Sequence, residues 1–196
     1  MFSEIGAKML ERMRYLEEKD RIDRVDGTAR LERLRQVPPE TGRFLAILAS
    51  NCPEGEFAEI GTSAGYSAMW ISLAAKERGI KLKTYELLEE KIRLAKETFA
   101  SAGIENYVEL IEGNALEHIG DLGPAAFCFL DTEKELYLPC WDILSGKIVP
   151  HGIFAADNAI NHYETVKPMI EKARNDIRFD CTVVPVGHGV LVCRRK

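Results

Sequence analysis

The sequence predicts an α/β protein: a doubly wound, mostly parallel seven-stranded sheet with a C-terminal antiparallel hairpin, preceded by an N-terminal helical extension. Three observations lead to this fold class. From Glu56 onward, short apolar runs alternate with longer amphipathic stretches, which is typical of repeated strand–helix units. The last two apolar runs flank Gly187-His188-Gly189, a typical hairpin turn. Before Pro38, the chain is rich in charge and carries apolar residues at helical spacing.

Each element follows from its local pattern. Apolar runs of strand length predict seven strands, at 56–60, 81–86, 108–112, 125–131, 152–157, 179–185 and 189–193. Amphipathic stretches predict helices at 64–78, 88–102, 134–144 and 163–175. Pro39 is suited to the first turn of a further helix that runs through Leu48. Because parallel strands need crossover helices, this order predicts a Rossmann-like sheet with helices on both faces.

Pro38-Pro39 separates two parts of the chain. Residues 1–36 form the predicted N-terminal helical extension, in which Asp26-Gly27 is expected to separate two helices because glycine interrupts a helical run. Residues 37–196 contain every predicted strand and therefore form the main domain.

The composition excludes several classes of protein. A formal net charge of -5 gives the whole chain no strong attraction for nucleic acid. No apolar run approaches the roughly 20 residues that a membrane span needs, and the first residues lack the apolar segment of a signal peptide. The sequence therefore predicts a cytoplasmic protein with no membrane partner. The five cysteines form no C-x-x-C pair, and we expect them to be reduced thiols.

Polar residues gather where the predicted strands end. Ligands of open α/β sheets bind outside the carboxyl ends of the strands, so these residues are candidates for a binding site. They are Glu59 with Gly61, Glu86, Asn114, Asp131, Asp157 and Asn158.

The first strand runs into a loop of small residues, Glu59-Ile60-Gly61-Thr62-Ser63-Ala64-Gly65-Tyr66-Ser67. Small residues let the backbone turn sharply and approach a ligand, although a tight strand–helix turn without a ligand would look similar. The loop lacks the G-x-G-x-x-G order and the Gly-Lys-Ser/Thr end of a P-loop, which disfavours a pyrophosphate site. Glu86 ends the second strand, where a carboxylate can accept both hydroxyls of a ribose or cap the following helix.

Asp131, Asp157 and Asn158 end neighbouring strands, so their oxygens are expected to converge. Two unpaired carboxylates would repel each other, and a hard divalent cation removes that cost. Three oxygen ligands with open positions suit Mg²⁺, whereas zinc prefers His or Cys. Taken singly, Asp157-Asn158 could be a turn and Asp131 a helix cap.

The loop from Glu59 to Ser67 resembles the cofactor motif of class I S-adenosylmethionine (SAM) dependent methyltransferases. Its Gly65-Tyr66-Ser67 resembles the catechol and caffeoyl-CoA O-methyltransferase families, and residues 37–45 are similar to the helix before their core. The resemblance runs from about residue 36 to the C-terminus. It implies a SAM site in which the loop contacts the methionine part, Glu86 binds the ribose and Asn114 lies near the adenine, where relatives commonly carry Asp. The implied cofactor-binding residues are Glu59, Gly61, Thr62, Ser63, Gly65, Tyr66, Ser67, Glu86, Asn114 and Asp131.

The same resemblance implies a metal site and a reaction. Asp131, Asp157 and Asn158 match the metal ligands of these families, and Lys134 resembles their general base, although a lysine on a helix surface is the alternative. The implied catalytic residues are Lys134 and Asp131. In this mechanism a substrate hydroxyl at the metal gives its proton to Lys134 and attacks the methyl group of SAM in line. His162, and His188 where many relatives carry Asp, are further residues that could approach the substrate.

The resemblance predicts a divalent-metal-dependent O-methyltransferase of a small catechol-like or polyhydroxylated substrate. The extension resembles segments that form lids or dimer contacts in relatives, which predicts a homodimer. A tRNA wobble hydroxyuridine is the alternative acceptor, because the extension is rich in arginine. A SAM-binding protein without catalysis and a NAD-binding oxidoreductase are disfavoured, because the metal ligands are present and the G-x-G-x-x-G loop is not.

Overall fold

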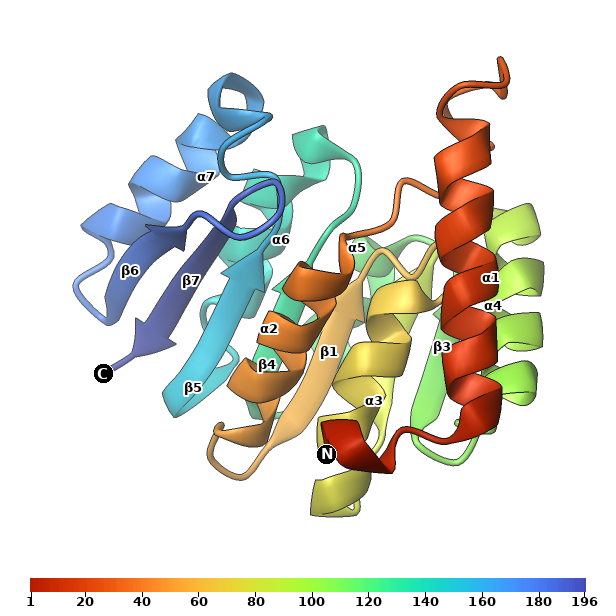
Figure 1. Cartoon of the computed structure of the whole chain (residues 1–196). Coiled ribbons are helices and arrows are strands. Elements are labelled where there is room, and N and C mark those ends of the chain that lie inside the picture. The colour runs from red at the N-terminus through yellow and green to blue at the C-terminus, as the bar shows by residue number, and fades with distance from the viewer.

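The computed structural model describes residues 1–196, except for the side chain of Glu4. Seven strands form one sheet in the order β3-β2-β1-β4-β5-β7-β6 (Figure 1). Their bounds are β1 (Glu56–Ile60), β2 (Leu82–Glu86), β3 (Val108–Glu112), β4 (Ala125–Leu130), β5 (Ile148–Ala156), β6 (Phe179–Val184) and β7 (Val190–Arg195). β7 pairs antiparallel with both β5 and β6, and the other pairs are parallel. The predicted fold class is therefore confirmed, with the hairpin's second strand placed inside the sheet.

The helices are α1 (Ala7–Asp23), α2 (Pro39–Ser50), α3 (Tyr66–Arg78), α4 (Glu89–Ala102), α5 (Ala115–His118), α6 (Tyr137–Leu144) and α7 (Tyr163–Asn175). Short 3-10 turns are η1 (Phe2–Glu4), η2 (Ile119–Asp121) and η3 (Lys134–Leu136). The predicted helix 134–144 therefore begins as η3 and continues as α6. Among the described residues, no helix is both long enough and apolar enough to cross a membrane.

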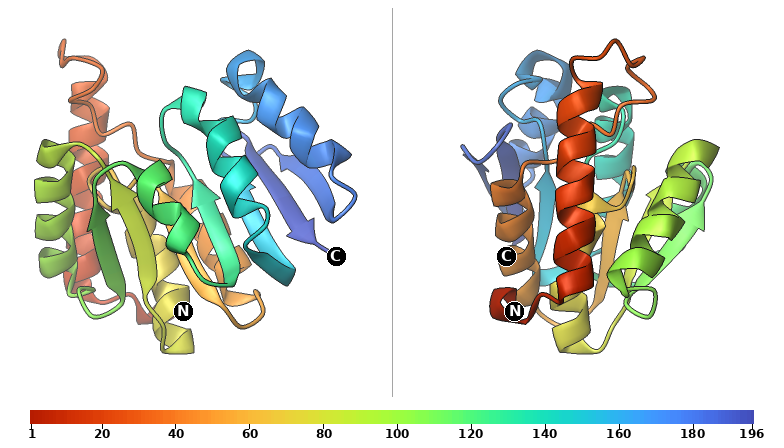
Figure 2. Two further views of the ribbon diagram at one scale, coloured as in Figure 1. Left: turned by 180° about the vertical axis from the view of Figure 1, so that it is seen from behind. Right: turned by 45° about the vertical axis from the view of Figure 1, so that its right-hand side comes forward.

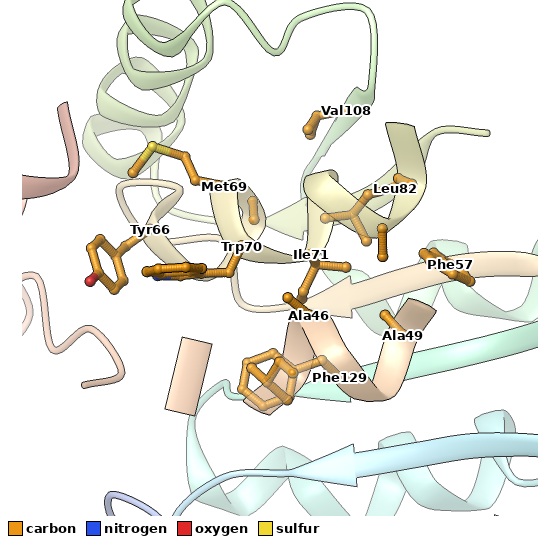
Figure 3. Close-up of a cluster of buried hydrophobic side chains, with 14 of the residues drawn as sticks. Ala46, Ala49, Phe57, Tyr66, Met69, Trp70, Ile71, Leu82, Val108 and Phe129 are labelled. Atoms are coloured by element: carbon orange, nitrogen blue, oxygen red, sulfur yellow. The ribbon is translucent and has the colours of Figure 1, made fainter. Parts of the chain in front are cut away.

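The sheet separates two hydrophobic cores because strand side chains alternate between its faces. On β4, Phe127 and Phe129 join the core beneath α2, α3 and α4, whereas Cys128 and Leu130 join the core beneath α5, α6 and α7. Figure 2 shows the second group of helices in front of the sheet when the molecule is seen from behind. Figure 3 shows part of the first core, where Ile71 of α3 lies beside Ala46 of α2. Both faces of the central strands are thus covered, which leaves the strand ends as the place for a site.

The extension departs from the sequence prediction. It contains α1, which lies along α4, but residues after Gly27 form turns and no second helix. Side chains hold the backbone of this stretch in place of helical hydrogen bonds. Asp23 accepts from the backbone N–H of Leu34 at 2.7 Å, and Lys91 Nζ donates to the carbonyls of Glu32 and Arg33 at 2.8 Å each. Tertiary partners therefore override the apolar spacing. We call residues 24–38 the linker.

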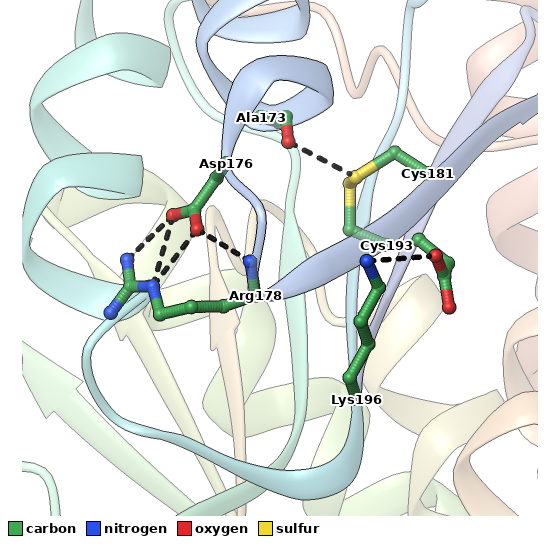
Figure 4. Close-up of a disulfide and its surroundings, with 7 residues drawn as sticks. Ala173, Asp176, Arg178, Cys181, Cys193 and Lys196 are labelled. Carbon is green, nitrogen blue, oxygen red and sulfur yellow. Dashed lines mark hydrogen bonds and ion pairs between the residues drawn. A yellow bond between two sulfur atoms is a disulfide. The ribbon is translucent and has the colours of Figure 1, made fainter.

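The expectation of five reduced thiols is wrong for two of them. Cys181 and Cys193 form a disulfide across β6 and β7 (Figure 4). They are register partners in the antiparallel ladder, with Cα atoms 4.1 Å apart, and directly opposed positions suit a disulfide. Sequence spacing alone does not reveal that register. Cys52, Cys128 and Cys140 are free and buried, and burial raises the pKa of Cys52 and of Cys140 to about 12.

Thiol titration checks this pairing. The protein unfolded in urea without reductant should show three reactive thiols, because Cys181 and Cys193 are bonded, and five after reduction. Reduction opens a loop of sequence separation 12 and should lower the free energy of unfolding by on the order of 3 kcal/mol. Cys52→Ser, the control, should remove one thiol and keep the disulfide. Five thiols before reduction in protein purified under air would contradict the pairing.

Candidate functional site

A cavity of about 340 Å³ opens at the carboxyl ends of the parallel strands and is roofed by the linker. Its volume is in the range of small-molecule sites. Eleven residues expected from the sequence line it: Gly61, Thr62, Ser63, Tyr66, Ser67, Glu86, Asn114, Asp131, Lys134, Asp157 and Asn158. Glu59 and Gly65 lie outside the lining. The linker contributes residues that sequence reasoning did not assign to the site, namely Arg24, Arg30, Leu31, Leu34, Arg35, Gln36 and Val37.

The loop after β1 is shaped by a close approach of Gly61 to the end of β4. Gly61 has φ of 102°, and a Cβ there would lie far inside contact distance of the Asp131 carbonyl oxygen. The N–H groups of Gly61 and Thr62 both donate to the Tyr85 carbonyl, at 3.1 and 3.2 Å. Ser63 follows with φ of 47°, a left-handed conformation that costs energy in a residue with a side chain. Glycine at position 61 is therefore a steric requirement.

Glu86 holds this loop and also the backbone that leads into α4. Its Oε2 accepts from the Ser63 N–H at 2.8 Å, and its Oε1 accepts from the N–H groups of Leu87 and Leu88 at 2.9 Å each. Leu88 is the N-cap of α4, and the helix has no side-chain cap hydrogen bond, so the helix-capping interpretation of Glu86 is wrong. Oε2 keeps one acceptor position, on the cavity side that Glu86 lines.

Glu59 lies behind the loop, with no exposed surface. Its Oε2 accepts from Thr84 Oγ1 at 2.6 Å, and Thr84 in turn must accept from Thr62 Oγ1 at 2.6 Å because its own hydrogen is used. Its Oε1 is buried without a partner. Burial raises the pKa of Glu59 to about 7. Glu59 does not line the cavity, and its direct contact with a ligand stays a prediction.

The structure brings the expected oxygen donors together. Asn158 Nδ2 donates to Asp131 Oδ1 at 3.0 Å and to Asp157 Oδ2 at 3.1 Å, so one amide bridges two carboxylates. Asp157 is almost fully buried, and its Oδ1 has no hydrogen-bond partner. Burial raises the pKa of Asp131; the charge of Lys134 opposes this shift and the charge of Asp157 adds to it.

This donor set fits a hard cation. Among the described residues, no group of three or more His, Cys, Asp or Glu side chains could hold a metal, so a soft or His-rich site is not formed. Two carboxylates and an amide form an oxygen set, and a turn of the Asn158 amide about its terminal torsion exchanges nitrogen for oxygen at the same place. The unpartnered Asp157 Oδ1 leaves acceptor capacity for a cation.

Lys134 is held beside these carboxylates and is not a surface lysine, since 12% of its side chain is exposed. Its Nζ donates to Asp131 Oδ1 at 3.0 Å, to the Thr132 carbonyl at 2.9 Å and to Tyr137 Oη at 3.0 Å. All three hydrogens of the ammonium group therefore have acceptors. Tyr137 is buried, and burial raises its pKa well above the ordinary value, so its hydroxyl stays protonated.

Both histidines noted in the sequence line the cavity. His188 Nδ1 lies 3.7 Å from Asp157 Oδ2, and the Asp157 carboxylate raises the pKa of His188. His162 follows the turn after β5 and is exposed. The hairpin turn and the turn after β5 thus line the cavity on the side of Asp157. We call the loop after β1, residues 61–67, the cofactor-type loop.

Comparisons with known proteins agree on one family. The profile of a family described as O-methyltransferase matches residues 14–196. The catechol O-methyltransferase of Niastella koreensis is 28% identical over 148 residues, 70% of this chain and 66% of that protein. The caffeoyl-CoA O-methyltransferase 2 of Zea mays is 28% identical over 187 residues, 83% of this chain and 70% of that protein. The SAH-bound methyltransferase structure from Podospora anserina gives a TM-score of 0.80 at 20% identity, covering 98% of this chain and 89% of that one, which shows the fold.

Alanine substitutions at two glycines with positive φ distinguish the cost of a steric clash from the cost of an unfavourable φ. Gly61→Ala should lower the free energy of unfolding by more than about 3 kcal/mol, because it adds a clash with backbone to an unfavourable φ. Gly79→Ala is the matched control: its φ is 65°, but nothing lies within 4 Å of the added Cβ, so about 1 kcal/mol is expected. Urea unfolding measures both, and equal losses would refute the close approach.

Glu59 should make stability depend on pH. Its pKa is raised from 4.5 to about 7 by burial, so between these values the folded state keeps a proton that the unfolded state releases. Stability should therefore fall as the pH rises through this window. At pH 8, Glu59→Gln should be more stable than wild type by on the order of 2 kcal/mol, with no gain at pH 4. The exposed Glu11→Gln is the control. Equal stability of wild type and Glu59→Gln at pH 8 would show that Glu59 is solvated.

Proposed function

The chain belongs to the O-methyltransferase family, and from that premise we propose that it transfers the methyl group of SAM to a hydroxyl of a small catechol-like or polyhydroxylated molecule, with Mg²⁺ or a similar cation. The observation that carries the proposal is one cavity that joins two parts. The loop around Gly61 forms one end, and the oxygen donors beside Lys134 form the other. Both reactants could therefore meet within a single cavity.

SAM is assigned to the loop end. Small residues allow the backbone to approach the methionine part, the free position on Glu86 Oε2 suits a ribose hydroxyl, and Asn114 lies where the adenine would end. A cationic cofactor also suits the buried Glu59, because positive charge nearby lowers the cost of ionising it. The Podospora anserina and Bacillus cereus relatives were crystallised with SAH, which supports the assignment.

The cation is assigned to Asp131, Asp157 and Asn158. When bound, a divalent cation at such oxygens lowers the pKa of a substrate hydroxyl and offsets the repulsion between the carboxylates. The catechol and caffeoyl-CoA names of the relatives support an acceptor with hydroxyls on adjacent carbons.

Lys134 is assigned as the group that takes the hydroxyl proton. Its Nζ lies 3.0 Å from Asp131 Oδ1, so a hydroxyl held beside Asp131 would be within reach of the amine that takes its proton. Thr132 and Tyr137 keep the nitrogen in place. The oxyanion then attacks the methyl carbon, the S–CH₃ bond breaks as the O–CH₃ bond forms, and the sulfonium becomes a neutral thioether.

The roles of the extension stay predictions. The linker covers the cavity, which suits a lid that excludes water from the reaction. A homodimer is checked by light scattering. Methylation of a tRNA hydroxyuridine would use the same catalytic groups. A comparison of a catechol with a hydroxyuridine tRNA as acceptors distinguishes the two reactions.

Release of S-adenosylhomocysteine tests the function. With SAM and Mg²⁺, turnover is expected on a catechol and not on a hydroxyuridine tRNA, with loss in EDTA and recovery when Mg²⁺ is restored. Asp157→Ala and Lys134→Met should each lower kcat by about a hundredfold or more. Asp142→Ala, which removes an exposed carboxylate paired with Lys172, is the control and should keep activity. Turnover that ignores EDTA, or occurs on tRNA alone, would rule out the proposed reaction.

A further inference from the structure

Three arginines of the linker line the cavity and have no part in the reaction described above. They are Arg24, Arg30 and Arg35. Arg30 and Arg35 belong to the acceptor end, because both pair with Glu133, which stands between Asp131 and Lys134 in the sequence. An acceptor bound beside Asp131 would therefore lie next to guanidinium groups.

Their charge is only partly compensated. Arg30 and Arg35 share one carboxylate, that of Glu133, at 3.2 and 2.7 Å. Arg24 donates through Nε to Asp20 at 2.7 Å, and its Nη2 reaches the Gln36 carbonyl only at 3.5 Å. Two guanidiniums on one carboxylate leave one positive charge and several free N–H donors at the cavity wall.

The other acidic groups of the cavity are already committed. Glu86 accepts three backbone N–H groups, and Asp131 and Asp157 are the proposed cation ligands. A divalent cation would be balanced by the Asp131 and Asp157 carboxylates, so these two groups leave the excess positive charge of the Arg30–Arg35 pair unmatched. A neutral acceptor leaves this charge uncompensated, whereas an anionic one offsets it.

The backbone beside Arg35 is anchored to the rest of the protein. Ser63 Oγ donates to the Leu34 carbonyl at 2.8 Å, and Asp23 accepts from the Leu34 N–H at 2.7 Å. Arg35 itself has φ of 49°, a conformation that costs energy and persists because its neighbours are fixed. Such preorganisation lowers the entropy lost when an anion is bound.

We propose that the acceptor carries an anionic group, a carboxylate or a phosphate monoester, and that Arg30 and Arg35 bind it, with Arg24 beside them. The planar fork of arginine suits two-point binding of both groups. Glu133, their present partner, stands between Asp131 and Lys134 in the sequence, so the anion lies within the reach of one small ring from the reacting hydroxyl. The proposal rests on the proposed function and narrows its substrate class.

The experiment compares acceptors that differ in charge. 3,4-Dihydroxybenzoate is anionic at neutral pH, and 3,4-dihydroxybenzamide is its neutral counterpart. For the phosphate arm, 3,4-dihydroxybenzyl phosphate is compared with 3,4-dihydroxybenzyl alcohol. In wild type, kcat/KM should favour the anionic member of the preferred pair by about tenfold to a hundredfold. The pair with the larger ratio of anionic to neutral kcat/KM shows whether the acceptor carries a carboxylate or a phosphate monoester.

Variants then locate the binding group. Arg30→Gln and Arg35→Gln should each lower the ratio, and the double variant should bring it near one. Arg14→Gln removes an exposed arginine of α1 outside the cavity and should leave the ratio unchanged. Each acceptor has its own intrinsic reactivity, which is the same for every variant. Comparing the kcat/KM ratio between variants therefore removes this contribution. Thermal unfolding confirms that the variants fold, and Arg30→Gln, away from the strained residue, gives a second reading if Arg35→Gln is unstable.

Two results would overturn the proposal: a wild-type ratio near one in both arms, or a ratio that survives in the double variant. Failure of the proposed function looks different, because no acceptor is then methylated. In that case calorimetry of the same pairs decides, with SAH present. Tighter binding of the anionic member that disappears in the double variant supports the anion site, and equal binding of both members refutes it.

Discussion

The contact between the ends of β1 and β4 is the constraint on which the site depends. The Asp131 N–H donates to the Ile60 carbonyl at 2.9 Å, and Gly61 then passes against the Asp131 carbonyl with no room for a side chain. The chain builds outward from β1 to β2 and β3 and then returns to the other side of β1 with β4. That reversal is the switch point at which open α/β sheets bind ligands. It places the cofactor-type loop and the oxygen donors on adjacent strands, within one cavity.

Several buried acidic side chains lie at the same edge of the sheet. Glu59 and Asp157 have almost no exposed surface, each has an oxygen without a partner, and Asp131 shares its environment with Lys134. Ionised carboxylates in such places cost stability unless positive charge compensates them. A cationic cofactor and a divalent cation would provide it. Under the proposed function, the buried acidic groups at this end of the sheet would thus be stabilised by the ligands that the site is proposed to bind.

Much of this arrangement could be predicted from the sequence. Strand periodicity gave the sheet, and the polar residues at strand ends gave Asp131, Asp157 and Asn158, which do converge. The features that local sequence patterns could not show depend on contacts between residues that are far apart in the chain. The Cys181–Cys193 pair requires the β6–β7 register, and the linker lacks a helix because Asp23 and Lys91 bind its backbone. Local patterns also do not show that Glu59 is fully buried and bonded to Thr84 of the neighbouring strand. The arginines were noticed as a charge pattern, yet only the fold brings them to the cavity.

The linker connects the two ends of the cavity through adjacent residues. The Leu34 carbonyl accepts from Ser63 in the cofactor-type loop, and the next residue, Arg35, pairs with Glu133 beside Lys134. Lys91, which also lines the cavity, holds the preceding carbonyls. A ligand that changes the loop around Ser63 therefore acts on the same few backbone bonds that aim Arg35. The proposed sites for the cofactor and the acceptor are therefore joined by adjacent residues of one short stretch of chain, Leu34 and Arg35.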